Sequence, residues 1–254
     1  MSSAAAVIIP SYNEAQRFDL EQLRQLVDAD DTTLLLVDDG STDATPAVLA
    51  EAHTRWPERV TLLTLPERHG KGEAVRAGLL AAVKQGADIV AYCDADFATP
   101  AVEVNRLVDA LRRRSELQAA IGSRVDLLGH EVHRPRSRTA GNRIYSAIGS
   151  WLLGARIRDT QCGAKVFRVS PQLEDALAAP FGDPWGFDVE LLGRLLLGRQ
   201  PHAGIDPDAI AEIPLESWHH VTGSKLRPSD GLRSLARLSL VRRRIRRWRA
   251  GELG

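Results

Sequence analysis

Short, largely apolar runs recur along the chain, and polar segments with glycine or proline separate them. The runs cover residues 4–10, 34–37, 60–63, 89–93, 118–121, 164–168 and 209–214. Apolar runs of this length that end at turn signals are typical of buried β-strands. Pro10, which ends the first run, forces an extended exit from the strand. The pattern therefore predicts a core built on a buried sheet.

Between the first runs, apolar residues recur at intervals of three and four, which is typical of helices. The first of these helices has its apolar face within residues 20–27, and the second begins near Pro46. Two more are expected over residues 72–83 and 100–114. Strand and helix thus alternate through the first 115 residues, which predicts an α/β fold with a doubly wound, mostly parallel sheet flanked by helices. Later helices are expected over residues 139–153 and 185–197.

The C-terminal segment has a different pattern. Residues 225–249 contain ten Lys or Arg and one acid, Asp230. Apolar residues fall at helical spacing, namely Leu232, Leu235, Leu238, Val241, Ile245 and Trp248. We therefore expect a basic amphipathic helix within residues 227–254. Two interpretations remain open: peripheral contact with an anionic membrane surface, or docking of the apolar stripe on the domain with the arginines in water.

Overall composition adds little about partners, because 33 Lys and Arg balance 33 Asp and Glu. No other feature supports a nucleic-acid partner for the basic segment. Cys93 and Cys162 show no metal or disulfide spacing, which favours reduced thiols and a cytoplasmic location. No basic region precedes the first apolar run, and no window approaches 18 apolar residues. We therefore expect neither a signal peptide nor a membrane span.

Polar clusters follow three of the predicted strands, at residues 12–14, 38–43 and 94–96. In doubly wound sheets, ligands bind beyond the carboxyl ends of the strands. Asp94 and Asp96 stand one residue apart, so a strand would present both on one face. Such oxygen ligands suit Mg²⁺ or Mn²⁺ together with substrate phosphates, although an isolated Asp-x-Asp is often only a solvated loop. With a ribose or base contact from Asp38 or Asp39, the clusters indicate a site for a nucleoside diphosphate leaving group.

Several common nucleotide and hydrolase motifs are absent. The first strand is not followed by Gly-x-Gly-x-x-Gly, and no Gly-x-x-x-x-Gly-Lys-Ser/Thr or Gly-x-Ser-x-Gly occurs. A classical dinucleotide site, a P-loop and a nucleophile elbow are therefore not expected.

A set of motifs, each weak alone, follows in order along the chain. They are VIIPSYNE at 7–14, VDDGSTD at 37–43, GKGEAVRAG at 70–78, DAD at 94–96, GSR at 122–124, DTQCGAK at 159–165 and WGFDVELL at 185–192. The set resembles family 2 glycosyltransferases of the GT-A fold, in the branch of dolichyl- or polyprenyl-phosphate sugar synthases. The last two motifs are most similar to the dolichyl-phosphate glucosyltransferase side of that branch.

The resemblance implies transfer of a hexose from a nucleotide sugar with inversion, and it implies roles for individual residues. The base and ribose would be lined by Pro10, Tyr12, Glu14 and Asp39. Asp94 and Ala95 would bind the diphosphate, Asp94 and Asp96 would hold Mg²⁺ or Mn²⁺, and Lys71 would lie near the sugar or diphosphate. Residues 1–226 would form the GT-A domain, with a nucleotide-sugar half at 1–122 and an acceptor half at 123–226.

The acceptor side follows from the same resemblance. A lipid phosphate can attack without a strong base but needs cations to hold it. The candidates for this clamp are Arg124, Arg138, Arg143 and Lys225. Asp188 stands where relatives with hydroxyl acceptors place a general base. The candidates for a direct part in catalysis are therefore Asp188 together with two members of the clamp, Arg124 and Lys225. Two structural interpretations also stand: Asp188 could cap its helix, and Glu190 could pair with Arg194.

The expected function is therefore an inverting, metal-dependent hexosyltransferase, with glucose favoured and UDP- or GDP-sugar as donor. The expected acceptor is a polyprenyl or dolichyl phosphate, reached from the cytoplasm by a protein that is either free or peripheral on the inner face of the membrane. Alternatives are the same donor chemistry onto a soluble hydroxyl acceptor, a nucleotidyltransferase, and a non-catalytic nucleotide-sugar-binding module. A nucleotidyltransferase would usually have a Gly-rich basic loop after the first strand, and residues 10–14 lack one.

Overall fold

The computed structural model describes residues 4–125, 131–132, 154–155, 157–183, 186–219, 221 and 230–253. The centre of the fold is a seven-stranded sheet in the order β10-β5-β7-β4-β1-β2-β3. Its strands are β1 (Ala5–Ser11), β2 (Thr32–Asp38), β3 (Val60–Thr64), β4 (Ile89–Tyr92), β5 (Ala119–Ser123), β7 (Lys165–Arg168) and β10 (Ile210–Pro214). All neighbours pair in parallel except β7, which runs antiparallel to both β4 and β5. The expected mostly parallel sheet is confirmed, and each predicted strand lies within a few residues of its place.

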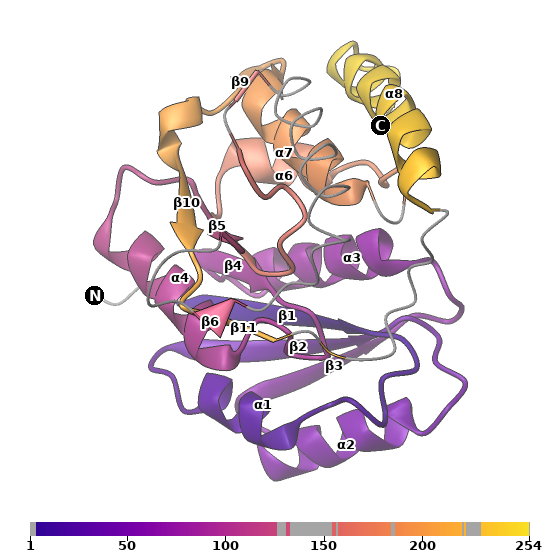
Figure 1. Ribbon diagram of the computed structural model, residues 1–254, viewed down its shortest axis with the longest axis vertical. Helices are drawn as coiled ribbons and strands as arrows, with labels where there is room; N and C mark the ends of the chain where they lie inside the picture. The colour runs from indigo at the N-terminus through magenta and orange to yellow at the C-terminus, as the bar shows by residue number, and fades with distance from the viewer. Residues whose placement is uncertain are drawn as a thin grey trace.

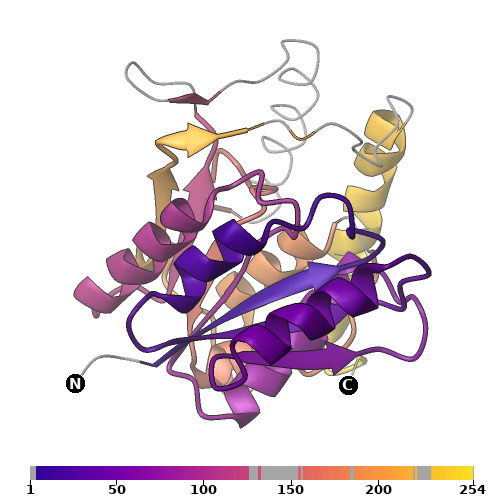
Figure 2. The same cartoon turned by 90° about the horizontal axis from the view of Figure 1, so that it is seen from below.

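Helices cover both faces of this sheet (Figures 1 and 2). One face carries α1 (Leu20–Val27), α2 (Thr45–Arg55) and α4 (Ala101–Arg113). The other carries α3 (Lys71–Lys84), α6 (Pro171–Leu177) and α7 (Phe187–Leu197), with α8 (Asp230–Arg249) outside α7. Small elements complete the described part: β6 (Glu131–Val132) with β11 (Ser217–Trp218), β8 (Gly198–Arg199) with β9 (His202–Ala203), and the 3₁₀ turn Pro207–Ala209. The helix expected over residues 139–153 lies outside the described residues.

The apolar core has two layers because strand side chains alternate between faces. Ile8 packs with α3 and α7, whereas its neighbours Val7 and Ile9 pack with α1 and α4 on the opposite face. The strands are buried on both sides, which explains why they appear in the sequence as continuous apolar runs. Gly78 lets α3 lie close to β1, since a Cβ at that position would overlap Ile8. This packing sets the start of α3 beside the carboxyl ends of β1 and β2.

The described part of α8 docks on the domain. Val241, Ile245 and Trp248 are buried, and α8 packs along α7. The docking interpretation of the C-terminal stripe is therefore confirmed for residues 239–253. Within the described residues, every helix is too short or too polar to cross a bilayer.

Candidate active site

The loops after β1 and β2 hold each other at the carboxyl edge of the sheet. The Asn13 side-chain oxygen accepts a hydrogen bond from the Thr42 amide (2.8 Å), and the Glu14 amide donates to Thr45 Oγ1 (2.8 Å). Asn13 adopts a left-handed conformation (φ 53°), which asparagine tolerates better than most residues. These bonds fix the backbone that carries Tyr12 and Glu14, two of the predicted donor-binding residues.

Two arginines accompany the predicted base and ribose residues. The Arg68 guanidinium lies over the Tyr12 ring, 4.2 Å from its centre, as cations do over aromatic faces. Glu14 pairs with Arg17 at 2.5 Å between Oε2 and an Arg17 terminal nitrogen. Pro10 lies half-buried near the end of β1. Pro10, Tyr12 and Glu14 thus follow one another along the end of β1, next to two cations that the sequence pattern did not identify.

Asp39 fixes the start of α3. It is buried, and its two carboxylate oxygens accept hydrogen bonds from the amides of His69 (2.7 Å) and Gly70 (2.8 Å). Gly70 has φ 97°, a conformation that favours glycine, and the next residue is Lys71, the first of α3. Asp39 therefore positions Lys71 through the backbone, and a contact with a ribose would use its remaining lone pairs.

Lys71 reaches across to the tip of β4. Its Nζ lies 2.5 Å from Asp94 Oδ1, and both side chains are about one-third exposed. Burial alone would lower the pKa of Lys71, but the charges of Asp94 and Asp188 outweigh it and raise that pKa. Lys71 is therefore a firmly charged ammonium within the acidic cluster, where it can meet a phosphate.

Asp94 and Asp96 lie at the carboxyl end of β4, as the sequence predicts. Asp96 accepts a hydrogen bond from the Ala98 amide (3.2 Å) and lies 3.8 Å from an Arg17 terminal nitrogen. Burial and the nearby charge of Asp94 raise the pKa of Asp96. The side chain of Ala95, between them, is buried in the core, so only its backbone can face a ligand.

The pair fits a divalent cation by its donor chemistry. Two oxygen-bearing carboxylates that repel each other are relieved by a cation between them, and Mg²⁺ is commonly held by one or two carboxylates plus substrate phosphates. Among the described residues no cluster of three or more His, Cys, Asp or Glu side chains could bind a metal without help. Asp94 and Asp96 would therefore hold the ion together with the diphosphate of the substrate.

Replacing Asp96 with asparagine is expected to raise the Tm of the metal-free protein at pH 7. The folded-state pKa of Asp96 is raised, so the fold favours the protonated form and the ionised form costs stability. This cost develops as pH rises through the unfolded-state pKa and is complete above the folded one. Thermal unfolding of both proteins in EDTA from pH 4 to 7 measures the effect. The Tm of the variant should exceed that of the wild type by more at pH 7 than at pH 4. A difference in Tm that shrinks towards pH 7 would contradict the prediction.

Asp188 belongs to a buried cluster behind Lys71. Its Oδ1 accepts hydrogen bonds from Lys165 Nζ (2.6 Å) and from the Tyr92 hydroxyl. Burial, followed by the charge of Asp188, raises the pKa of Tyr92 well above its usual value. The N-cap of α7 is Gly186, and the partners of Asp188 come from other elements, so the helix-cap interpretation is wrong.

Arg124 is already engaged. Its Nε and one terminal nitrogen each lie 2.8 Å from an oxygen of Asp159, and its amide also donates to that carboxylate. Both side chains are largely buried. An acceptor phosphate bound by Arg124 would therefore meet only the remaining guanidinium N–H groups. The other predicted clamp residues lie outside the described part of the chain, namely Arg138, Arg143 and Lys225.

The sequence pattern gave no role to five residues of this region: Arg17, Arg68, Tyr92, Lys165 and Asp159. The last two stand inside the motif at 159–165, but nothing in the pattern gave them a role. Tyr92 ends an apolar strand and has the pattern of a core residue, whereas Arg17 lies in a loop without periodicity. Only the folded chain brings Arg17, Tyr92 and Lys165 against predicted acids, and Asp159 against Arg124.

Comparison with known proteins identifies the family of the chain. Residues 6–172 match the family described as Glycosyl transferase family 2. The dolichyl-phosphate beta-glucosyltransferase of Drosophila melanogaster is 33% identical over 88% of this chain and 69% of its own length. The polyprenol monophosphomannose synthase of Mycolicibacterium smegmatis is 30% identical over 75% of this chain and 71% of its own length.

Among solved structures, glucosyl-3-phosphoglycerate synthase from Mycobacterium tuberculosis, in complex with UDP, has a similar fold. Its TM-score is 0.65 at 23% identity, and the match covers 96% of this chain and 80% of that one. The same enzyme with Mn²⁺, UDP-glucose and phosphoglyceric acid gives a TM-score of 0.63 at 22% identity, covering 97% and 78%. The expected GT-A architecture is therefore confirmed. With its family match over more than half its length and relatives at 30% identity or more, this chain belongs to glycosyl transferase family 2 and is a glycosyltransferase.

Proposed function

We propose that this glycosyltransferase moves a hexose, with glucose favoured, from a nucleoside diphosphate sugar to a polyprenyl phosphate, with inversion at the anomeric carbon. The observation that supports this most strongly is the joint position of Asp94, Asp96 and Lys71 at the carboxyl edge of the sheet. There a divalent cation and an ammonium can together meet a diphosphate. The dolichyl-phosphate glucosyltransferases and the polyprenol monophosphomannose synthase among the relatives favour a lipid phosphate as acceptor.

In the donor half of the site, different residues would bind the nucleoside and the diphosphate of the nucleotide sugar. Tyr12 and Glu14, on the loop after β1, would contact the base and ribose. UDP is the favoured nucleotide because the solved structures of similar fold contain UDP or UDP-glucose with Mn²⁺. Mg²⁺ or Mn²⁺, held by Asp94 and Asp96, would neutralise the charge that develops on the leaving diphosphate. Lys71 adds a positive charge to the same group.

The acceptor half needs no strong base. A phosphate oxygen of the lipid is already an anion, so it can attack the anomeric carbon directly from the face opposite the diphosphate. The new carbon–oxygen bond forms as the bond to the nucleoside diphosphate breaks, and the electron pair leaves with the diphosphate. Asp188 is already paired with Lys165 inside the protein. This pairing fits an acceptor that needs no general base better than a hydroxyl acceptor, from which Asp188 would have to take a proton. Arg124, Arg138, Arg143 and Lys225 stay our candidates for holding the acceptor phosphate.

Incubation with labelled UDP-glucose, a polyprenyl phosphate and Mn²⁺ or Mg²⁺ tests the proposal. Label should enter the organic phase only with the lipid acceptor, and EDTA should abolish the transfer. GDP-mannose in parallel tests the alternative donor. Label transferred only to a water-soluble product, such as that of a phosphorylated small acceptor, would overturn the lipid acceptor while keeping the donor chemistry.

The enzyme would meet its acceptor in the cytoplasm, at the inner face of the membrane, through the outer side of α8. Val241, Ile245 and Trp248 are buried, so this part of the helix cannot insert its apolar stripe without undocking. The exposed side chains are mostly arginines: Arg242, Arg243, Arg246, Arg247 and Arg249. Basic side chains near an anionic membrane surface contribute about 1 kcal/mol each. The contact is therefore electrostatic and peripheral.

Changing Arg243, Arg246 and Arg249 to glutamate is expected to abolish binding to vesicles that contain anionic lipid. These residues recur at a spacing of three on α8, so the reversal removes much of the basic face. Flotation at low and at 0.5 M salt measures the effect, and binding of the wild type should fall steeply with salt. The matched control reverses three exposed arginines elsewhere: Arg55, Arg113 and Arg114. Equal loss in the control, or salt-independent binding, would contradict the role of α8.

A further inference from the structure

The turn that leads into β7 lies directly against the Asp94 carboxylate. Gly163 is buried in this turn, and a Cβ atom at its position would overlap the carboxyl group of Asp94. Any other residue at position 163 would therefore push Asp94 aside. The same carboxylate also contacts α3, because Lys71 Nζ lies 2.5 Å from Asp94 Oδ1. The carboxylate is thus placed between a glycine backbone and an ammonium.

Lys165 fixes the same turn from inside the protein. It is fully buried, and its Nζ donates to the Cys162 carbonyl and to Asp188 Oδ1, each at 2.6 Å. The Cys162 carbonyl is part of the peptide group that joins Cys162 to Gly163. The ammonium therefore holds the peptide that touches Asp94, from inside the protein.

Strand register brings Lys165 to this place. β7 runs antiparallel to β4, with Lys165 opposite Tyr92, two residues before Asp94. A buried ammonium is costly unless it is paired and hydrogen-bonded. Asp188 supplies the counter-charge from the first turn of α7, and the Tyr92 ring lies 5.4 Å from the ammonium. The cost of burying this charge is offset by partners from three different elements.

We propose that Gly163 and Lys165 are positioning residues for Asp94. Gly163 leaves the space that the carboxylate occupies, and Lys165 holds the adjoining peptide in place. Asp188 acts through Lys165, as its fixed counter-ion, and does not exchange protons with the acceptor. The inference rests on the donor half of the proposed function and is independent of the acceptor.

The direct test is Gly163→Ala, with Mn²⁺ and UDP binding measured by calorimetry. Loss of a group that orients a metal ligand typically weakens metal affinity about 10–100-fold, and we expect a loss in that range. Gly86→Ala is the matched control. Gly86, unlike Gly163, has a left-handed backbone conformation (φ 87°), and a Cβ there would meet nothing within 4 Å. The control therefore adds backbone strain that Gly163→Ala does not have, but it leaves the site untouched. Wild-type binding by a folded Gly163→Ala protein would overturn the inference.

Lys165 is tested by the pair Lys165→Met/Asp188→Asn, because Lys165→Met alone leaves an unpaired buried carboxylate. The double variant removes both charges and should weaken binding of Mn²⁺ with UDP about tenfold or more. Asp188→Asn alone should also weaken that binding, whereas loss of a general base would lower kcat and leave donor binding intact. Normal Mn²⁺–UDP binding in both variants would overturn the inference.

The wild type separates this inference from the proposed acceptor. If it binds Mn²⁺ with UDP but transfers nothing to lipid phosphate, only the proposed acceptor fails. If it binds neither Mn²⁺ nor UDP, the donor site and this inference fail together.

Discussion

Replacing Asp96 with alanine is expected to lower glycosyl transfer by about 10²–10³-fold, the usual effect of removing one group that stabilises developing charge. Asp96 lies at the tip of β4, and its oxygens would be among the few that hold the divalent cation against the diphosphate. Without it, Asp94 alone would face the metal. Initial rates with labelled UDP-glucose and polyprenyl phosphate, at saturating Mn²⁺ or Mg²⁺, measure the loss.

The fold should survive this change. Among the described residues, the Asp96 side chain accepts one hydrogen bond, from the Ala98 amide, and forms a loose ion pair with Arg17; neither supports the core. The matched control is Asp109→Ala, which removes a half-exposed carboxylate of α4 that forms loose ion pairs with Arg112 and Arg113 on the same helix. The control should keep wild-type activity. Full activity in a folded Asp96→Ala protein would refute the metal assignment.

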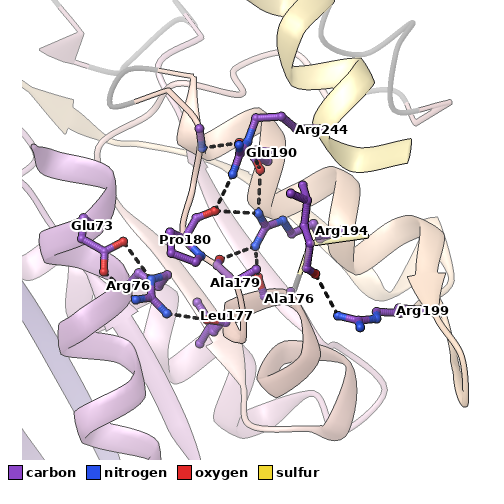
Figure 3. Close-up of polar contacts among 12 residues, drawn as sticks. Glu73, Arg76, Ala176, Leu177, Ala179, Pro180, Glu190, Arg194, Arg199 and Arg244 are labelled. Carbon is purple, nitrogen blue, oxygen red and sulfur yellow. Dashed lines mark hydrogen bonds and ion pairs between the residues drawn. The ribbon is translucent and has the colours of Figure 1, made fainter. Parts of the chain in front are cut away.

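Replacing Arg194 with methionine is expected to lower the Tm by roughly 10 °C. Arg194 and Glu190 are fully buried and pair at 2.6 Å on α7 (Figure 3). Arg194 also donates to the carbonyls of Ala176, Ala179 and Pro180. Removing one partner of a buried pair costs about 3–5 kcal/mol, because the other charge stays buried. For a domain of this size each kcal/mol shifts Tm by about 2–4 °C.

The loss should extend to α8, because Glu190 also lies 3.3 Å from Arg244 Nε, and Arg244 donates to the Pro180 carbonyl (2.8 Å). Thermal unfolding followed by circular dichroism measures the change. Arg24→Met is the matched control, since Arg24 pairs with Glu21 and Asp28 on the solvent side of α1. Adding Glu190→Gln to Arg194→Met should restore part of the stability. A shift no larger than that of the control would contradict the role of the buried pair.

These two predictions concern different layers of the same α/β design. The ionised Asp96 side chain lowers the stability of the fold, because its charge is held near that of Asp94. The same closeness of two carboxylates suits them to hold a divalent cation. Arg194 and Glu190 lie two turns or less from Asp188 on α7 and join α6, α7 and α8, as Figure 3 shows around Pro180. Phe187 and Asp188 open the same helix, and the Phe187 ring lies 5.8 Å from Lys71 Nζ. The buried pair therefore also supports the residues that pack next to Lys71.

The order of strands and helices in the first 125 residues, and the place of the acids, can be predicted from the amino-acid sequence. A strand buried on both faces needs a continuous apolar run, and a parallel sheet sends the ends of such runs to one edge. For this reason the apolar runs alone are enough to assign Asp39, Asp94 and Asp96 to one edge of the sheet. The pairing of Glu190 with Arg194 also follows from the sequence, because residues four apart lie on one helix face.

The partners of these residues cannot be predicted in this way, because they come from distant parts of the chain. The antiparallel insertion of β7 between β4 and β5 places Lys165 under Asp94, and no local pattern specifies that register. The same holds for Asp188, whose side chain could cap a helix or pair with a lysine from a distant strand. Amphipathic spacing likewise could not tell whether α8 covers the domain or a membrane, because both bury the same stripe. The partners of Lys165, Asp188 and α8 depend on contacts between residues far apart in the chain. The free energies of these contacts depend on burial, which only the folded chain defines.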